Sequence, residues 1–166
     1  MSVFYKTYFH GGSSRKNTKV LTKRIPRAFY KKVHATMPIV CVDLVVKRGK
    51  EFLLVKRKNN PLRGEWFFPG GRVLKNETLK NAALRKLKEE TGLGGKVKKF
   101  FGTGEHFENG YFAGIQTHII TFVFLVETAG RLVSIDAQSA GFSWRNSIAP
   151  SLKPYIKDFL RKAGFK

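Results

Sequence analysis

The feature that most constrains the fold is the run IVCVDLVV at residues 39–46. Almost every position is apolar and several are β-branched, which is the pattern of a strand covered on both faces. The turn RGK at residues 48–50 leads into a second apolar run, EFLLVKR at residues 51–57. Two such runs joined by a tight turn predict a β-hairpin.

An amphipathic helix is expected at residues 78–91. Leu79, Ala83 and Leu87 recur at intervals of four and form its apolar stripe, and Gly92 follows as a stop signal. The helix follows a short strand that ends in Pro-Gly-Gly. Glycine there lets the backbone come close to a ligand and leaves a carbonyl available, and Arg72 follows with a planar donor group suited to phosphate.

Two shorter helices are expected near the ends of the chain. One begins at Pro26 and places Phe29, Tyr30 and Val33 on one side, and the other spans residues 154–163. Further strands are expected around residues 96–104, 117–127 and 141–144. Strands mixed with helices predict an α/β domain with a mixed sheet.

The chain has 166 residues and a net charge of +21, and the charge is concentrated near the beginning. The first 35 residues contain nine Lys or Arg and no acid. We expect a basic, flexible or extended arm at residues 1–25 and one compact domain at residues 26–166. The positive charge of this arm favours weak, salt-dependent contact with polyanions such as RNA. The alternative is that the excess of basic residues serves only solubility.

The sequence predicts a cytoplasmic protein with no membrane segment. It lacks both a signal-peptide pattern and any apolar stretch of about 18 residues. Cys41 is the single cysteine and lies within an apolar run, so a buried free thiol is expected there.

The helix at residues 78–91 carries charged residues that point to a cation site. At about 100° per residue, Arg85, Lys86, Glu89 and Glu90 fall within one arc of roughly 140°. Paired carboxylates on a rigid helix suit a hard divalent cation such as Mg²⁺, although the same residues also form ordinary i,i+4 pairs on a wet face.

The spacing of these residues resembles the Nudix box, Gly-x5-Glu-x7-Arg-Glu-U-x-Glu-Glu-x-Gly-U with U aliphatic. The matching positions are Gly71, Glu77, Arg85, Leu87, Glu89, Glu90, Gly92 and Leu93. The exception is Lys86, where the box has glutamate. The resemblance implies the Nudix fold, a mixed sheet between helices, and hydrolysis of nucleoside diphosphate derivatives assisted by Mg²⁺ or Mn²⁺.

Outside the box, the stretches VDLVV, EFLLVKR and NPLRGEWFFPGGRVLKNETL resemble the GDP-mannose mannosyl hydrolase branch of that family. This branch also lacks the glutamate at the position of Lys86. The resemblance implies C–O cleavage of a GDP-sugar such as GDP-mannose to GDP and free sugar. It implies metal ligands at Gly70, Glu89, Glu90 and Gln138, substrate binding by Asp43, Arg57 and Arg72, and catalytic roles for Arg72, Arg85, Glu89 and His106.

The general base is the point at which this chain departs from the branch, because Ser139 stands where the branch has histidine. A serine hydroxyl does not act as a base at neutral pH, and Lys86 needs a pKa lowered by several units to do so. Glu89, Glu105 and His106 are the candidates, the last two in the expected loop GEHFENG at residues 104–110. Lys86 is expected instead to exclude an additional metal ion.

Two other functions remain open from the sequence. One keeps the fold but cleaves P–O bonds, as in pyrophosphatases that act on nucleotides or ADP-ribose. The other is a weakly active nucleotide- or RNA-binding Nudix module, which the basic beginning and Ser139 favour. A homodimer is a further expectation, because relatives are often dimers.

Overall fold

The computed structural model describes residues 19–22, 25–131, 134 and 139–166. The helices are α1 (Arg27–Thr36), α2 (Leu79–Thr91) and α3 (Pro154–Lys162). The strands are β1 (Ile39–Arg48), β2 (Glu51–Arg57), β3 (Trp66–Phe67), β4 (Gly70–Arg72), β5 (Lys96–Phe112), β6 (Ile115–Glu127) and β7 (Ser139–Arg145). None of the helices in these residues is long and apolar enough to cross a membrane.

The described strands form one mixed sheet in the order β3-β2-β1-β6-β5. β1 runs parallel to β6 and antiparallel to β2, with Val46 opposite Leu53, so the predicted hairpin is confirmed. The short β4 pairs with the first half of β1, and β7 pairs with β2. β1 therefore has different neighbours along its two halves.

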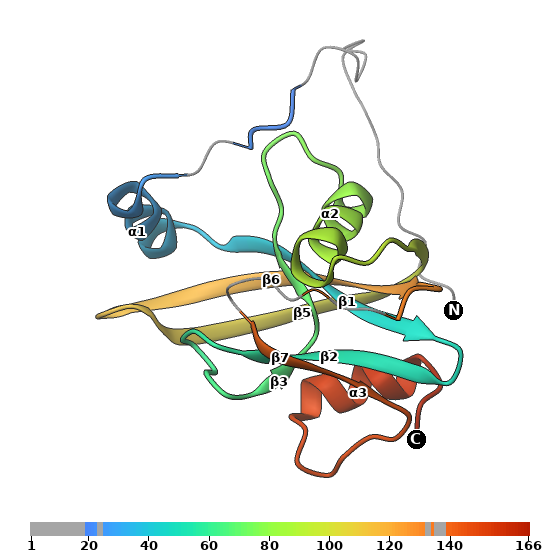
Figure 1. Ribbon diagram of the computed structural model, residues 1–166. Helices are drawn as coiled ribbons and strands as arrows, with labels where there is room; N and C mark the ends of the chain where they lie inside the picture. Colours follow the sequence, from blue (N-terminus) through green and yellow to red (C-terminus); the bar gives the residue numbers. More distant parts are fainter. Residues whose placement is uncertain (1–18, 23–24, 132–133, 135–138) are drawn as a thin grey trace.

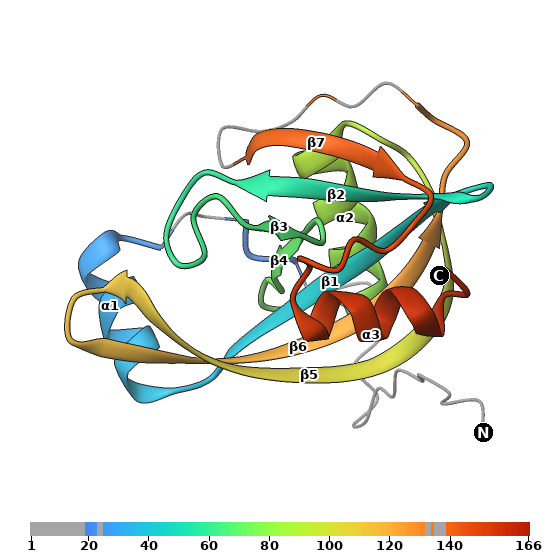
Figure 2. The same ribbon diagram turned by 90° about the horizontal axis from the view of Figure 1, so that it is seen from below.

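Helices α2 and α3 cover opposite faces of the sheet (Figures 1 and 2). On the α2 side, Leu87 packs with Leu44 of β1. On the α3 side, Ile156 packs with Val45 and Phe52. All five side chains are fully buried, and each contributes about 1.5–3 kcal/mol to folding by leaving water. The predicted mixed sheet between helices is confirmed.

The predicted boundaries of α2 are confirmed by its caps. The Thr78 hydroxyl accepts a hydrogen bond from the Asn81 N–H at 3.2 Å, which satisfies one free amide of the first turn. Gly92 ends the helix with φ +69°, a left-handed conformation that costs glycine little. These caps fix where the carboxylates of the last turn lie.

Residues 104–110 are not the loop that the sequence predicted. They lie within β5, which pairs with β6 along a long hairpin, and His106 is opposite Ile119. The polar composition of this stretch favours a loop, but the paired strand β6 is rich in β-branched residues and holds the segment extended. Glu105 and His106 therefore occupy fixed strand positions.

Helix α1 lies at the end of the sheet, beside the turn of the β5–β6 hairpin (Figures 1 and 2). Of the three apolar residues that the sequence places on one side of this helix, Tyr30 and Val33 are half-buried and Phe29 is 58% exposed. His34 is the buried residue, at 4% exposure, and its Nδ1 lies 2.8 Å from the Thr117 hydroxyl of β6. The helix packs through this polar contact and through aromatic rings.

Most of the predicted arm, including residues 1–18, lies outside the described residues. The described part contacts the loop before α2: the Leu21 N–H donates to the Lys75 carbonyl at 3.2 Å, and the Asn76 amide donates to the Lys19 carbonyl at 3.0 Å. These contacts place residues 19–21 beside the loop that carries the start of the box.

Candidate active site

The last turns of α2 present charged side chains to one cleft, as the sequence predicted. Leu87 is fully buried in the core and fixes the rotation of the helix. Lys86 Nζ lies 2.7 Å from Glu90 Oε1 and 3.3 Å from Glu89 Oε2. The ammonium of Lys86 therefore sits between the two carboxylates.

The Lys86–Glu90 pair is largely shielded from water, with side-chain exposures of 10% and 12%. Burial alone lowers the pKa of Lys86, but the adjacent Glu90 and Glu89 carboxylates outweigh burial and raise it above its ordinary value. Both carboxylates therefore favour the protonated form of Lys86, which agrees with the expectation that it is a poor general base. Glu90 also accepts a hydrogen bond from the Gly70 N–H at 3.0 Å.

Arg85 is held by carboxylates on both sides. Its Nε donates to Glu77 at 2.7 Å, one terminal nitrogen donates to Glu89 at 3.0 Å, and the other donates to the Arg72 carbonyl at 3.0 Å. Burial raises the pKa of Glu77, but hydrogen bonds from Arg85 and the Leu74 N–H outweigh burial, so the pKa lies below its ordinary value. Arg85 thus ties α2 to β4.

The two glycines of β4 permit a close approach between strand and helix. Gly71 has φ +144°, and a Cβ there would lie 2.7 Å from Lys86 Cε. A Cβ on Gly70 would lie 2.3 Å from the Val42 carbonyl oxygen and 2.4 Å from Asp43 Oδ1. A larger residue at Gly70 would push β4 away from β1, and one at Gly71 would adopt a strained backbone and displace the end of the Lys86 side chain.

Asp43 lines the same cleft, next to Gly70 of β4, and its side chain contacts α3. Its side chain accepts a hydrogen bond from the Tyr155 hydroxyl at 2.8 Å. Burial raises the pKa of Asp43 to about 7, even though the Tyr155 hydrogen bond opposes the rise. The His106 ring packs edge-on against Tyr155 with centroids 4.5 Å apart, and burial lowers the pKa of His106.

A cleft of about 950 Å³ joins these groups. Arg57 and Arg72 line it, and neither forms an ion pair with a carboxylate within the described residues. The Arg72 guanidinium lies 5.0 Å from the centroid of the Tyr30 ring, and that of Arg57 lies 6.0 Å from Phe67. Two guanidinium groups without a carboxylate partner among the described residues thus share the cleft with the Glu89 and Glu90 carboxylates.

Nearly all of the predicted site residues line this one cleft. They are Asp43, Arg57, Gly70, Arg72, Arg85, Glu89, Glu90 and His106. Gln138 lies outside the described residues, and Ser139 lines the cleft. Glu105 does not line it, because its carboxylate points to His118 at 2.8 Å on an exposed part of the hairpin.

The sequence did not predict the aromatic groups of the cleft. Tyr30 and His34 come from α1, and Tyr111 and Phe112 come from the end of β5. Tyr155 of α3 contacts the cleft residue Asp43 through its hydroxyl. These residues look like ordinary core positions in the sequence. Only their pairing with charged groups, which the fold creates, shows that they belong to the site.

The oxygen atoms at the end of α2 suit a hard divalent cation. Glu89 and Glu90 supply carboxylates, and Gly70 brings its main chain to Glu90. No group of three or more His, Cys, Asp or Glu side chains gathers in the part of the chain that the structure describes, at the end of α2 or elsewhere. An ion at this place would therefore need main-chain or ligand oxygens as well, and it would share Glu90 with the Lys86 ammonium.

Comparisons with known proteins agree with this geometry. The NUDIX domain family model matches residues 37–153. The chain is 36% identical over 141 residues to the low-salt glycan biosynthesis protein Agl8 of Haloferax volcanii, covering 84% of this chain and 90% of that protein. It is 34% identical over 153 residues to an ADP-ribose pyrophosphatase of Methanocaldococcus jannaschii, covering 89% and 86%.

Among solved structures, the MutT protein of Methanosarcina mazei Go1 superposes with a TM-score of 0.63 at 26% identity, covering 75% of this chain and 92% of that one. A MutT Nudix hydrolase from Burkholderia pseudomallei gives the same TM-score at 22% identity, covering 75% and 97%, and shows the fold alone. The fold, the box on α2 and the match over residues 37–153 all agree. The chain belongs to the Nudix family of hydrolases.

Proposed function

We propose that this chain hydrolyses nucleoside diphosphate derivatives with the help of Mg²⁺, and that Mn²⁺ also serves. One observation carries the proposal. The Glu89 and Glu90 carboxylates line the same cleft as Arg57 and Arg72, whose guanidinium groups form no ion pair with a carboxylate in the described residues. A diphosphate with a bound cation complements both sets of charges, since the cation meets the carboxylates and the phosphates meet the arginines.

Glu90, Glu89, the Gly70 carbonyl and Gln138 are the proposed ligands of the ion. Nudix hydrolases generally use divalent cations. A bound ion would neutralise the negative charge that develops on the diphosphate leaving group. Arg85 acts through its contacts, because it holds Glu89 and the Arg72 carbonyl in place. Its own charge is largely balanced by Glu77.

The first substrate class we propose is a GDP-sugar such as GDP-mannose. The likeness to the mannosyl hydrolase branch supports it, as does the 36% identity to a protein named for glycan biosynthesis. Water would attack the anomeric carbon, the C–O bond would break, and its electron pair would remain on the diphosphate of GDP. Arg57 and Arg72 would stabilise that charge, and Asp43 would bind the sugar or the nucleoside.

The water must lose a proton to a base in the cleft, and we propose His106 or Glu89 for this role. The lowered pKa of His106 keeps its ring neutral at pH 7, and its Nε2 is buried without a hydrogen-bond partner within the described residues. Glu89 is already bound by Arg85, so it is the weaker acceptor.

P–O cleavage is the second candidate. It is favoured by the 34% identity to a protein named ADP-ribose pyrophosphatase over 89% of this chain, and by Ser139 in place of the branch's histidine. In this case water attacks phosphorus and the products are two phosphomonoesters, such as AMP and ribose 5-phosphate.

The two cleavage modes are separated by incubating the protein with GDP-mannose and ADP-ribose in Mg²⁺ and water enriched in ¹⁸O. C–O cleavage places ¹⁸O in free mannose and leaves GDP, whereas P–O cleavage places ¹⁸O in a phosphate, which shifts its phosphorus NMR signal. Glu90→Gln is expected to lose at least 100-fold in kcat. Glu127→Gln is the matched control, because Glu127 pairs with Lys98 on the surface.

Turnover by Glu90→Gln at the parental rate would refute the proposed metal-assisted hydrolysis. The alternative is that the protein is a nucleotide- or RNA-binding module rather than an enzyme. In that case neither substrate would give a product, and the protein would bind RNA with an affinity that falls steeply as salt rises. The proposed homodimer is measured in the same preparation by sedimentation equilibrium.

A further inference from the structure

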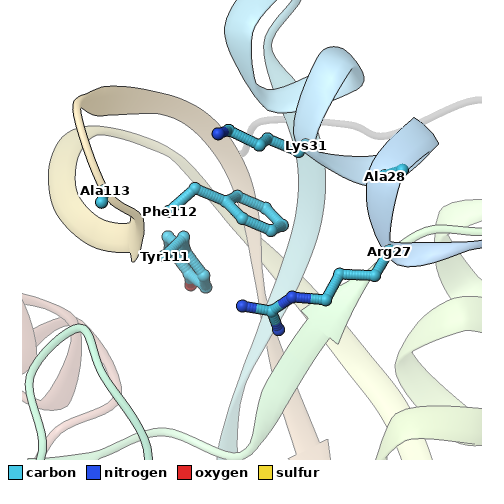
Figure 3. A pocket seen from close by; sticks show the side chains of 6 residues that line it. All are labelled: Arg27, Ala28, Lys31, Tyr111, Phe112 and Ala113. Carbon is cyan, nitrogen blue, oxygen red and sulfur yellow. The ribbon is translucent and has the colours of Figure 1, made fainter.

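A second hollow of about 550 Å³ opens between α1 and the turn of the β5–β6 hairpin. Figure 3 shows the side chains of α1 on one side and those of the hairpin on the other. Its lining residues are Arg27, Ala28, Lys31, Tyr111, Phe112 and Ala113. Arg27, Tyr111 and Phe112 also line the main cleft, so the two hollows meet at these side chains.

The Phe112 ring is held firmly at this junction. It packs edge-on against Tyr30 and His34, with centroids 6.1 Å and 5.1 Å away. The Arg27 guanidinium lies 5.3 Å from the Phe112 centroid. A flat aromatic ligand can stack on such a ring without reorganising it, since neighbouring rings already fix its orientation.

The hollow also carries positive charge without acidic groups. Arg27 and Lys31 line it, no Asp or Glu is among its lining residues, and neither cation forms an ion pair within the described chain. Tyr111 connects this region to the main cleft, because it lines both hollows and Arg57 lines the cleft. The cations of the outer hollow and the proposed phosphate-binding arginine therefore line two adjoining hollows that share Tyr111.

We infer that the outer hollow is the nucleobase subsite of this enzyme, with the base stacked on Phe112 beside Arg27. The inference rests on the proposed function, because the diphosphate of the same ligand would lie at Arg57 and Arg72. A planar, electron-rich base suits a ring and a guanidinium better than a sugar does. Helix α1 precedes residues 37–153, so this subsite depends on a segment outside the matched family domain.

The test is equilibrium binding, so that it does not depend on turnover. Calorimetry in Mg²⁺ compares GDP with inorganic pyrophosphate, which has the same charge-bearing group and no base. Phe112→Ala is expected to weaken GDP binding about 5- to 150-fold, the range for loss of one stacked base, and to leave pyrophosphate binding unchanged. Phe112→Tyr, which retains a ring, should restore most of the GDP affinity.

Phe29→Ala is the matched control, because Phe29 lies on the same helix with its side chain exposed. It should bind both ligands as the parent does. The inference is overturned if Phe112→Ala leaves GDP binding unchanged, if it weakens pyrophosphate equally, or if Phe29→Ala has the same effect. Base-dependent GDP binding by a protein that hydrolyses no nucleotide would overturn the proposed function and uphold the subsite.

Discussion

Replacing Lys86 with methionine tests the shielded ion pair on which the arrangement of the cleft depends. Lys86 Nζ and Glu90 Oε1 are 2.7 Å apart, and both side chains are close to 90% shielded from water. Breaking a buried pair by removing one partner costs roughly 3–5 kcal/mol, because the other charge remains buried without compensation. Here the Gly70 N–H still donates to Glu90, so we expect a loss of about 2–3 kcal/mol in the free energy of unfolding.

The measurement is urea unfolding in EDTA at pH 7.5 for the parent, Lys86→Met, Glu90→Gln and the double variant. The double-mutant cycle should give a coupling of about 2 kcal/mol. The control cycle removes Lys98 and Glu127, which lie 3.3 Å apart on the surface with 47% of each side chain exposed, and should give less than about 0.5 kcal/mol. Equal couplings in the two cycles would refute the reasoning.

Metal binding gives an independent check on the same residue. Because the ammonium of Lys86 occupies one side of Glu90, Lys86→Met should bind Mn²⁺ more tightly than the parent does. Lys86→Glu adds oxygen donors, so the number of bound ions should rise from one to two or more when measured by calorimetry. An unchanged stoichiometry would remove the proposal that Lys86 excludes an additional cation.

Three further predictions concern two titratable groups that line the cleft and one side chain of the core. The pKa of Asp43, raised to about 7, gives stability that is complete below pH 4 and lost as pH rises through 7. Urea unfolding in EDTA should therefore show the parent losing about 4 kcal/mol relative to Asp43→Asn between pH 4 and 8, and parallel curves would contradict this. Burial raises the pKa of Cys41 to about 12, so Ellman's reagent at pH 8 should modify it slowly in the native protein and rapidly in urea; equal rates would show an accessible thiolate. Leu87→Ala should cost about 3 kcal/mol in chemical unfolding, whereas Leu21→Ala, at an exposed position, should cost less than about 0.5 kcal/mol; similar losses would place Leu87 outside the core.

Much of the fold could be predicted from local pattern. The apolar run of β1 required cover on both faces, and α2 and α3 supply it. The glycine after α2 marked its end correctly. The length of β5 could not be predicted in this way, because residues 104–110 are polar and become a strand only through pairing with β6.

The charged part of the site was predictable because its residues share one helix. Helical geometry alone places Lys86, Glu89 and Glu90 together, and the structure has them in contact. The aromatic part was not predictable, because Tyr155 meets Asp43 across 112 positions of sequence. Contacts of that kind depend on how α3 packs on the sheet, which no local pattern specifies.

On one edge, β1 pairs with two different strands, and this limits which insertions and deletions the protein can tolerate. Residues 41–43 pair with β4, and residues 46–48 pair with β2. Deleting one residue between these segments would shift the register, so that a core side chain replaces Asp43 and the glycines of β4 lose their pairing with β1. The turn at residues 113–114 of the β5–β6 hairpin lies apart from this pairing, since β6 meets β1 from Ile119 onward. Tyr111 and Phe112 beside the turn line both hollows, so insertions at the turn would alter which ligands fit while the pairing of β1 stays intact, and new specificities should arise by lengthening it.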